Sequence, residues 1–156
     1  MSQRIFRHIS IAIALALSCL ATQAETPGPL ATYRPPLSAE LKARLMQADV
    51  AAGARFFERK CSQCHDGEKT GAHAKGPLLW NVFGRRAGTI AGFAFSPAMQ
   101  AAGVVWDFAT LDYYLADTER AVPGRAMDFA GIADPALRAA VVLHLSRLAD
   151  SPPPLP

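Results

Sequence analysis

Apolar residues recur with the period of an α-helix in two segments near the ends of the chain, residues 49–60 and residues 134–148. Both segments begin with an aspartate that can cap a helix, and in the second a proline follows at the first helical position. The shared faces consist of Val50, Ala54 and Phe57 in the first segment and of Leu137, Val141, Leu145 and Leu148 in the second. A glycine inside the first helix, Gly53, costs about 1 kcal/mol relative to alanine and predicts a close helix crossing there.

Two further helices are predicted between and before these segments. Thr110 can cap a helix that runs to about Asp117, with Leu111, Tyr114 and Leu115 on one side. Ser38 can cap a short helix that precedes the domain. Strand-like alternation is absent from the sequence, so we expect an all-α fold. The long aperiodic stretches between the helices fit a compact domain if they pack around a large prosthetic group.

The first 24 residues have the pattern of a secretory signal peptide. Basic residues Arg4 and Arg7 precede an apolar run over residues 9–20, which is too short to span a membrane. Small residues then lead to a cleavage site after Ala24. Cleavage there would leave 132 of the 156 residues and place the protein in the periplasm.

The remaining chain divides into three predicted parts. Residues 25–48 form a Pro-rich lead-in with the short helix, which either packs on the domain or acts as a solvated spacer, and the composition slightly favours the spacer. Residues 49–149 form the domain, and residues 150–156 form a Pro-rich tail without regular structure.

The net charge says little about function, because removal of the signal peptide leaves 14 basic and 13 acidic residues. The sequence shows no basic stripe with interleaved aromatic residues, so nucleic-acid binding is not expected. Electrostatic attraction to a partner would have to come from local patches.

The residues Cys61-Ser62-Gln63-Cys64-His65 form a C-x-x-C-H motif, which is typical of c-type haem attachment. Two thiols separated by one helical turn can reach the two vinyl groups of a single haem, and the adjacent imidazole can then bind the iron. A zinc half-site and a redox dithiol are the alternatives. The first lacks a second ligand pair in the sequence and the second lacks a βαβ context. The motif therefore predicts one covalently bound haem c, with Cys61 and Cys64 as attachment residues.

The second axial position of the iron decides between electron transfer and ligand binding, because a thioether there gives a closed centre that favours the reduced form. From the residues alone, several thioethers and imidazoles could occupy it. The candidates are Met46, Met99, Met127, His73 and His144. Core packing is the ordinary role of a methionine, so the sequence alone leaves the choice open.

The chain from Asp49 to Leu148 resembles the class I cytochromes c, the bacterial periplasmic and mitochondrial type. The resemblance rests on five segments in the same order and at the same spacing. These are Gly53, Phe57 and the C-x-x-C-H motif; Gly76-Pro77-Leu78 with Val82-Phe83-Gly84-Arg85; Gly92-Phe93, Ser96 and Gly103-Val104-Val105-Trp106; Leu111 with Tyr114-Leu115; and Pro123-Gly124-Arg125-Ala126-Met127 with Phe129 and Gly131.

The resemblance implies a role for each matched residue. It implies that His65 and Met127 are the axial ligands and that the Pro77 carbonyl accepts a hydrogen bond from His65. It also implies a haem environment formed by Pro77, Arg85, Trp106, Tyr114 and Phe129, in which Arg85 and Trp106 bind a propionate.

The chain departs from the family pattern in four respects. Phe95 stands where many relatives have a propionate-binding tyrosine, and Met99 replaces a polar residue near the haem. Arg125-Ala126 replaces a frequent Thr-Lys pair, and His144 replaces an aromatic residue at the helix crossing.

These observations predict a periplasmic one-electron carrier that exchanges electrons with redox partner proteins. It is expected to be neither an enzyme nor a binder of small-molecule substrates, since no distal histidine or acid pair supports catalysis. The alternatives are an electron-accepting subunit of a periplasmic dehydrogenase or oxidase, and a gas-binding or peroxidase-like protein if Met127 is not a ligand. We therefore expect a monomer or a subunit of a redox complex. A docking patch could consist of Lys69, Lys75, Arg86 and Arg125.

Overall fold

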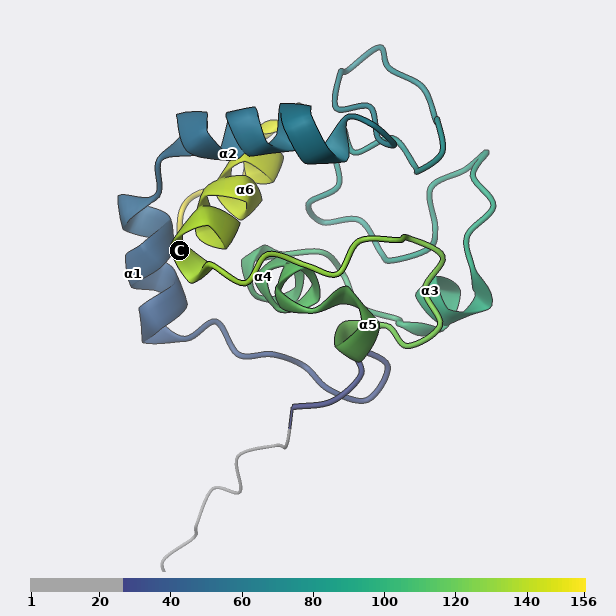
Figure 1. Cartoon of the computed structure of the whole chain (residues 1–156), viewed down its shortest axis with the longest axis horizontal. Helices are drawn as coiled ribbons and strands as arrows, with labels where there is room; N and C mark the ends of the chain where they lie inside the picture. Colours follow the sequence, from purple (N-terminus) through teal and green to yellow (C-terminus); the bar gives the residue numbers. More distant parts are fainter. Residues whose placement is uncertain (1–26) are drawn as a thin grey trace, which may run out of the picture.

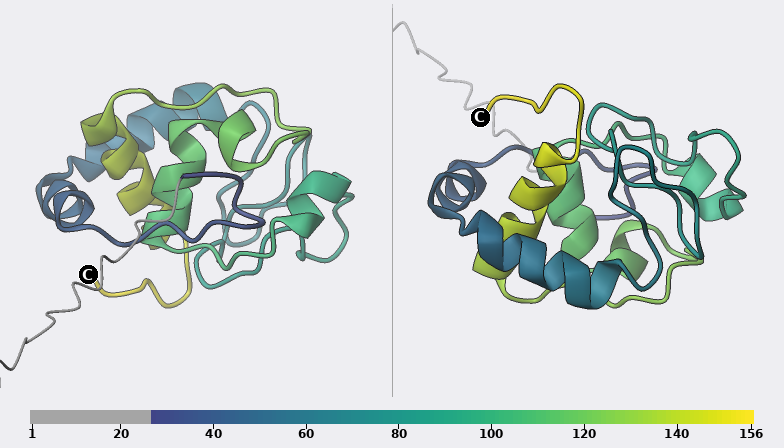
Figure 2. Two further views of the ribbon diagram at one scale, coloured as in Figure 1. Left: turned by 90° about the horizontal axis from the view of Figure 1, so that it is seen from below. Right: turned by 90° about the horizontal axis from the view of Figure 1, so that it is seen from above.

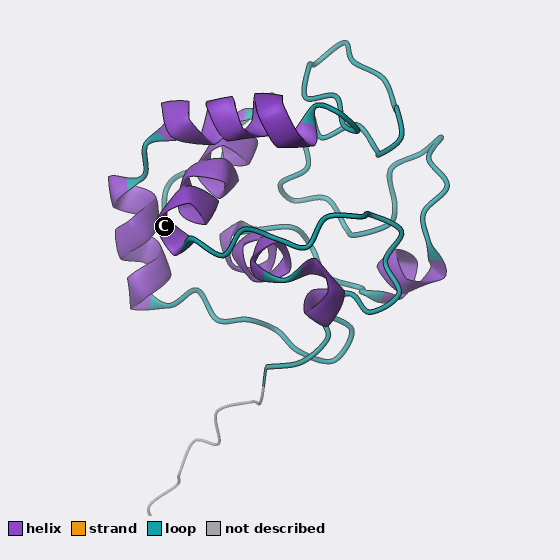
Figure 3. Ribbon diagram, viewed as in Figure 1, coloured by secondary structure: helices purple, strands orange, loops and turns teal. Residues whose placement is uncertain are grey.

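The structure is a computed structural model that describes residues 27–156, so the predicted signal peptide at residues 1–24 lies outside the described residues. Its helices are α1 (Ala39–Gln47), α2 (Val50–Phe56), the π-helical turn η1 (Phe57–Cys61), α3 (Pro97–Ala101), α4 (Phe108–Ala116), α5 (Thr118–Ala121) and α6 (Pro135–Arg147). Within residues 27–156 there is no strand, only an isolated bridge between Arg86 and Val105 (Figure 3). The predicted all-α fold class is confirmed.

Helices α2 and α6 cross in close contact, and this crossing organises the domain (Figure 1). Gly53 is buried there, and a Cβ atom on it would lie 2.1 Å from the carbonyl oxygen of Ala140. Helix α2 is capped by Asp49, whose carboxylate accepts hydrogen bonds from the backbone amides of Ala51 and Ala52. The missing side chain at Gly53 therefore lets the two backbones touch, as the sequence predicts.

The third helix of the core, α4, begins slightly earlier than predicted. Its cap is Asp107, and Thr110 is the third residue of the first turn. The two side chains form a reciprocal capping box, in which Thr110 accepts from the Asp107 backbone and donates its own N–H to the Asp107 carboxylate. The prediction of Thr110 as the cap was thus wrong, because a hydroxyl serves equally well three residues into the helix.

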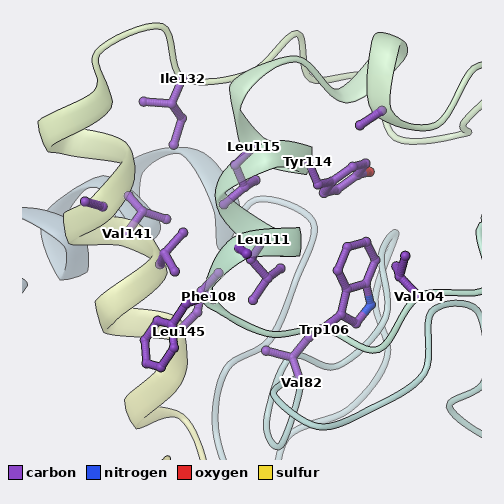
Figure 4. Close-up of a cluster of buried hydrophobic side chains, with 14 of the residues drawn as sticks. Val82, Val104, Trp106, Phe108, Leu111, Tyr114, Leu115, Ile132, Val141 and Leu145 are labelled. Carbon is purple, nitrogen blue, oxygen red and sulfur yellow. The ribbon is translucent and has the colours of Figure 1, made fainter. Parts of the chain in front are cut away.

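Helices α4 and α6 pack around a shared apolar core (Figure 4). Leu111 and Leu115 of α4 face Val141 and Leu145 of α6, and Trp106 and Tyr114 extend the core toward the loops. In Figure 1 helices α1, α2 and α6 occupy one side of the molecule, and the long loops over residues 62–96 lie with α3 on the other. The loops therefore form one wall of the region to which the C-x-x-C-H motif belongs.

One buried ion pair joins α4 to α6. Arg138 of α6 donates from Nε to the Asp112 carboxylate at 2.9 Å, and from Nη1 to the Ile132 carbonyl at 2.7 Å. The two side chains are only 10 % and 14 % exposed. Removal of either partner would leave the other charged and nearly desolvated.

The lead-in is part of the folded domain, so the expectation of a solvated spacer was wrong. Leu30 is completely buried, and Leu41 and Leu45 of α1 are nearly so. The Leu30 amide donates to the carbonyl of Ala121, and α1 packs against α6. Seen from below, the lead-in passes across α4 and α5 before it reaches α1 (Figure 2). The lead-in packs on the domain because the apolar side chains of α1 are buried against it.

We expect Leu45→Ala to lower the free energy of unfolding by about 2–5 kcal/mol, because Leu45 is 1 % exposed and its truncation leaves a cavity. The neighbouring Met46→Ala is the matched control, since Met46 is 64 % exposed. Chemical denaturation of the two variants measures the difference. Equal stability of the two variants would show that the lead-in is not part of the cooperative unit.

The C-terminal tail leaves the domain at an anchored residue, Asp150. Its carboxylate accepts hydrogen bonds from Asn81 at 2.7 Å and Trp80 at 3.4 Å, and it pairs with Lys69 at 2.6 Å. These contacts, with that from Lys69 the strongest, lower the pKa of Asp150 to about 2. Residues 151–156 then continue without helix or strand. No helix within residues 27–156 has the length and apolar character needed to span a membrane.

Candidate functional site

The C-x-x-C-H motif lies where the first core helix ends. Helix α2 runs directly into the π-helical turn η1, which ends at Cys61, and the His65 amide donates to the Cys61 carbonyl at 2.9 Å. The sulfur atoms of Cys61 and Cys64 are not bonded to each other. Burial, with a smaller effect of the neighbouring Cys64, raises the pKa of Cys61 to about 11. Cys61 is therefore held as the neutral thiol, and neither sulfur is consumed by a disulfide.

His65 is fixed in one orientation by its Nδ1 atom, which lies 2.8 Å from the carbonyl oxygen of Pro77. A carbonyl can only accept, so Nδ1 carries the proton and Nε2 keeps its lone pair. Burial lowers the pKa of His65, against the opposing effect of the Pro77 hydrogen bond, and this favours the neutral ring. A neutral imidazole with a free Nε2 is the form that binds a metal.

The backbone beside this ring must be a glycine. A Cβ atom on Gly76 would lie 2.4 Å from Cε1 of His65, and the Gly76 amide donates to the Cys64 carbonyl at 2.7 Å. The loop therefore presses its backbone against the imidazole from one side while Pro77 binds it.

Met127 lies in the loop between α5 and α6. The Tyr114 hydroxyl donates to its sulfur at 3.9 Å, and the rings of Tyr114 and Trp106 are 5.3 Å apart. Burial raises the pKa of Tyr114 to about 12, which keeps the hydroxyl protonated as a donor. Cys61, Met127 and the half-buried Phe129 all pack against the same cluster of buried apolar residues.

Arg85 is the charged residue of this region. It is half-buried and donates to the carbonyls of Leu78 at 2.9 Å and Trp80 at 3.3 Å. Burial lowers the pKa of Arg85. These bonds hold the guanidinium in the loop wall, while the Arg85 carbonyl accepts from the amide of the buried Trp106 at 2.9 Å.

Each of the other axial candidates has its own surroundings in the structure. Met46 is exposed on α1, and His144 packs against the Phe57 ring at 5.1 Å. Both ring nitrogens of His73 are engaged: Nε2 donates to the Ala91 carbonyl, and Nδ1 accepts from the Leu78 amide. Met99 is half-buried on α3 and packs against the core. His73 instead links two loops, a role that the sequence analysis missed.

The residues present fit a haem better than they fit the alternatives. No group of three or more His, Cys, Asp or Glu side chains within residues 27–156 could hold a metal ion, which removes the zinc site from consideration for this part of the chain. Two unbonded thiols, the His65 imidazole with a free Nε2, and the thioethers of Met99 and Met127 remain, in a region lined by apolar side chains. This donor set matches a haem with two axial ligands.

Only part of the predicted docking patch is exposed and free of ion pairs among the described residues. Lys69 pairs with Asp150, and the Arg125 side chain is only 14 % exposed and pairs with Glu119. Of the four predicted residues, Lys75 and Arg86 are exposed and form no ion pair with any described residue. The sequence gives no signal for the inward orientation of Arg125.

Comparison with known proteins gives one family. The family model described as cytochrome c matches residues 50–148. The chain is 44 % identical to a cytochrome c of Chlamydomonas reinhardtii over 99 residues, which is 64 % of this chain and 88 % of the relative. It is 47 % identical to cytochrome c2 iso-2 of Magnetospirillum fulvum over 88 residues, or 56 % of this chain and 91 % of the relative. The lead-in of residues 25–48 lies outside the family match.

Proposed function

Because the chain belongs to the cytochrome c family, and is thus a haem electron carrier with one covalent haem, we propose that it works in the periplasm and that His65 and Met127 bind its iron. The haem, when bound, supplies an iron that changes between its ferric and ferrous states. Cys61 and Cys64 would hold the macrocycle, and Arg85 and Trp106 would face a propionate.

One observation carries the proposal of His65 and Met127. The chain offers an imidazole whose Nδ1 is already committed to Pro77 and a thioether whose sulfur accepts from Tyr114. Both contacts fix the direction of a ligand without occupying its metal-binding lone pair: Nε2 of His65 stays free, and a thioether sulfur has two lone pairs. Preset ligands need little rearrangement when the charge of the iron changes, which suits one-electron transfer.

The surrounding side chains support the same role by keeping water out. Trp106, Tyr114 and Leu111 are buried, and they form an apolar wall between the loops and α6. A low-dielectric surrounding and a thioether ligand both favour the reduced state. No described residue supplies a distal histidine that is free to act on a bound ligand, because both nitrogens of His73 are engaged and His144 packs on Phe57. We therefore propose a carrier and not an enzyme.

The absorption spectrum of the ferric protein tests this proposal, together with addition of carbon monoxide to the reduced form. We expect a low-spin spectrum with the weak far-red sulfur-to-iron band, and no carbon monoxide binding. Met127→Ala should abolish the band, admit carbon monoxide and lower the reduction potential by roughly 0.1–0.3 V, within the span of about 0.8 V that axial ligands control. Met99→Ala is the matched control and should keep the band. A high-spin wild-type spectrum with ready carbon monoxide binding would instead indicate gas binding or peroxide chemistry.

The periplasmic location rests on the signal pattern of residues 1–24. Mass analysis of the exported protein should give a chain that begins at Glu25. The lead-in packs on its own domain, which speaks against its use as a tether in a redox complex. Size exclusion of the native protein should therefore show a monomer, and co-elution with a dehydrogenase or oxidase would favour the subunit alternative.

A further inference from the structure

Arg125, two residues before Met127, lies at the centre of a network that ties the Met127 loop to α5. Its Nε donates to the Thr118 hydroxyl at 2.5 Å, its Nη2 donates to the Phe129 carbonyl at 3.3 Å, and its Nη1 pairs with the Glu119 carboxylate. One guanidinium thus engages a helix side chain, an acidic side chain and the backbone beyond Met127. Its five donors and planar shape allow this combination.

The network holds the loop on both sides of Met127. Before it, the Gly124 amide donates to the Glu119 carboxylate at 3.1 Å. After it, the Thr118 hydroxyl donates to the Phe129 carbonyl, and the Thr118 amide donates to the Ala130 carbonyl at 3.2 Å. The loop segment that carries the thioether is therefore closed at both ends onto one short helix.

The contacts of Arg125 are partly buried, which increases the free energy lost when they are removed. Thr118 is completely buried, and the side chain of Arg125 is 14 % exposed, although Glu119 is 57 % exposed. Hydrogen bonds to a charged group are stronger than neutral ones, and their loss leaves buried partners unsatisfied. Without Arg125 the buried Thr118 hydroxyl would still donate to the Phe129 carbonyl, but its oxygen would lose the charged donor that it accepts from.

We propose that Arg125 is a positioning residue that keeps the Met127 loop closed and so protects the thioether ligand from replacement by competing ligands. This inference rests on the proposed ligation by Met127. A thioether is a neutral and weak ligand, so the residence of its sulfur on the iron depends on how often the loop opens. Arg125 acts on that opening and not on the iron itself.

The test is the rate at which added imidazole replaces the thioether in the ferric protein, followed by loss of the far-red band. At saturating imidazole this rate is limited by opening of the Met127 loop. Arg125→Gln should accelerate it about 10- to 100-fold, as expected for the loss of charged hydrogen bonds. Arg125→Lys should restore only part of the slow rate, because an ammonium keeps the charge but lacks the planar fork.

Two control variants separate this role from general effects. Arg120→Gln removes a positive charge from the same short helix, where Arg120 lies over the Tyr113 ring and forms no ion pair with a described residue. Leu45→Ala lowers stability at a distant site. In both variants imidazole should replace the thioether at the wild-type rate. An Arg125→Gln rate within twofold of wild type, or equal acceleration by Leu45→Ala, would overturn the proposal.

A readout without the far-red band separates failure of this inference from failure of the proposed function. Amide hydrogen exchange of residues 126–130 reports loop opening directly. If the wild type lacks the band but Arg125→Gln still speeds this exchange at least tenfold, Met127 ligation fails while the loop closure by Arg125 stands. Unchanged exchange in Arg125→Gln would overturn the closure itself.

Discussion

Gly53→Val is expected to prevent stable folding, and Gly53→Ala to lower the free energy of unfolding by about 4 kcal/mol or more, among the largest effects of single substitutions. A Cβ atom at this position would lie 2.1 Å from the Ala140 carbonyl oxygen and 2.5 Å from its carbon. Both obstacles are backbone atoms of a helix, so only separation of α2 from α6 can relieve the clash. The gain in helix propensity from alanine, about 1 kcal/mol, is too small to compensate.

Chemical denaturation of the haem-loaded protein measures this effect. Ala51→Val is the matched control, because Ala51 is exposed on the same helix and the substitution costs only helix propensity. A Gly53→Ala variant within 1 kcal/mol of wild type would contradict the tight crossing. The crossing also bears on the haem site, since α2 leads directly into the turn that ends at Cys61.

Removal of one partner of the buried pair between α4 and α6 is the second large effect that we expect. Arg138→Met should lower the free energy of unfolding by about 3–5 kcal/mol, because it leaves the Asp112 carboxylate desolvated and unpaired. It also removes the donor to the Ile132 carbonyl. The double variant Arg138→Met with Asp112→Leu should recover much of the loss, since an apolar pair of similar volume often replaces a buried ion pair at little cost.

Arg147→Met is the control for this experiment. Arg147 lies exposed in the last turn of the same helix and forms no ion pair with any described residue, so its replacement should change stability by less than about 0.5 kcal/mol. A double variant no more stable than the Arg138→Met single variant would indicate that the carbonyl contact, and not the charge pair, accounts for the loss.

The parts of the fold that the sequence predicts are those with several local signals in agreement. The last helix combines an Asp134 cap, Pro135 in the first turn and an apolar stripe, and the structure has α6 from Pro135 to Arg147. The first core helix has a cap and a glycine that marks a crossing. For Thr110 a single signal was misleading, because cap and capping-box residues share the same chemistry.

The packing of the lead-in could not be predicted from the sequence, because the surface that it packs against is formed by residues far away in the chain. Pro-rich composition favours a solvated segment, and one buried leucine, Leu30, does not form a periodic pattern. Its burial depends on contacts with residues about 90 positions later, such as the Ala121 carbonyl. Such contacts carry no local signature in a single sequence.

Some features of the candidate site could be predicted from local sequence, and others became visible only in the structure. The C-x-x-C-H motif is local, and its chemistry can be predicted from spacing alone. The choice of Met127 among five candidates needed the family resemblance, and the engagement of both His73 nitrogens became visible only in the structure. Arg125 was predicted as a member of a surface docking patch, whereas in the structure the buried Thr118 gives it a partner.

The contact between α2 and α6 also constrains the order of events when the protein is made. The chain leaves the ribosome from its N-terminus, so Cys61, Cys64 and His65 become available long before the last helix exists. Until α6 is complete, α2 lacks the surface against which Gly53 packs. In the folded domain Cys61 and Cys64 are half-buried. We therefore expect haem to reach both cysteines more readily before α2 and α6 have packed together than afterwards.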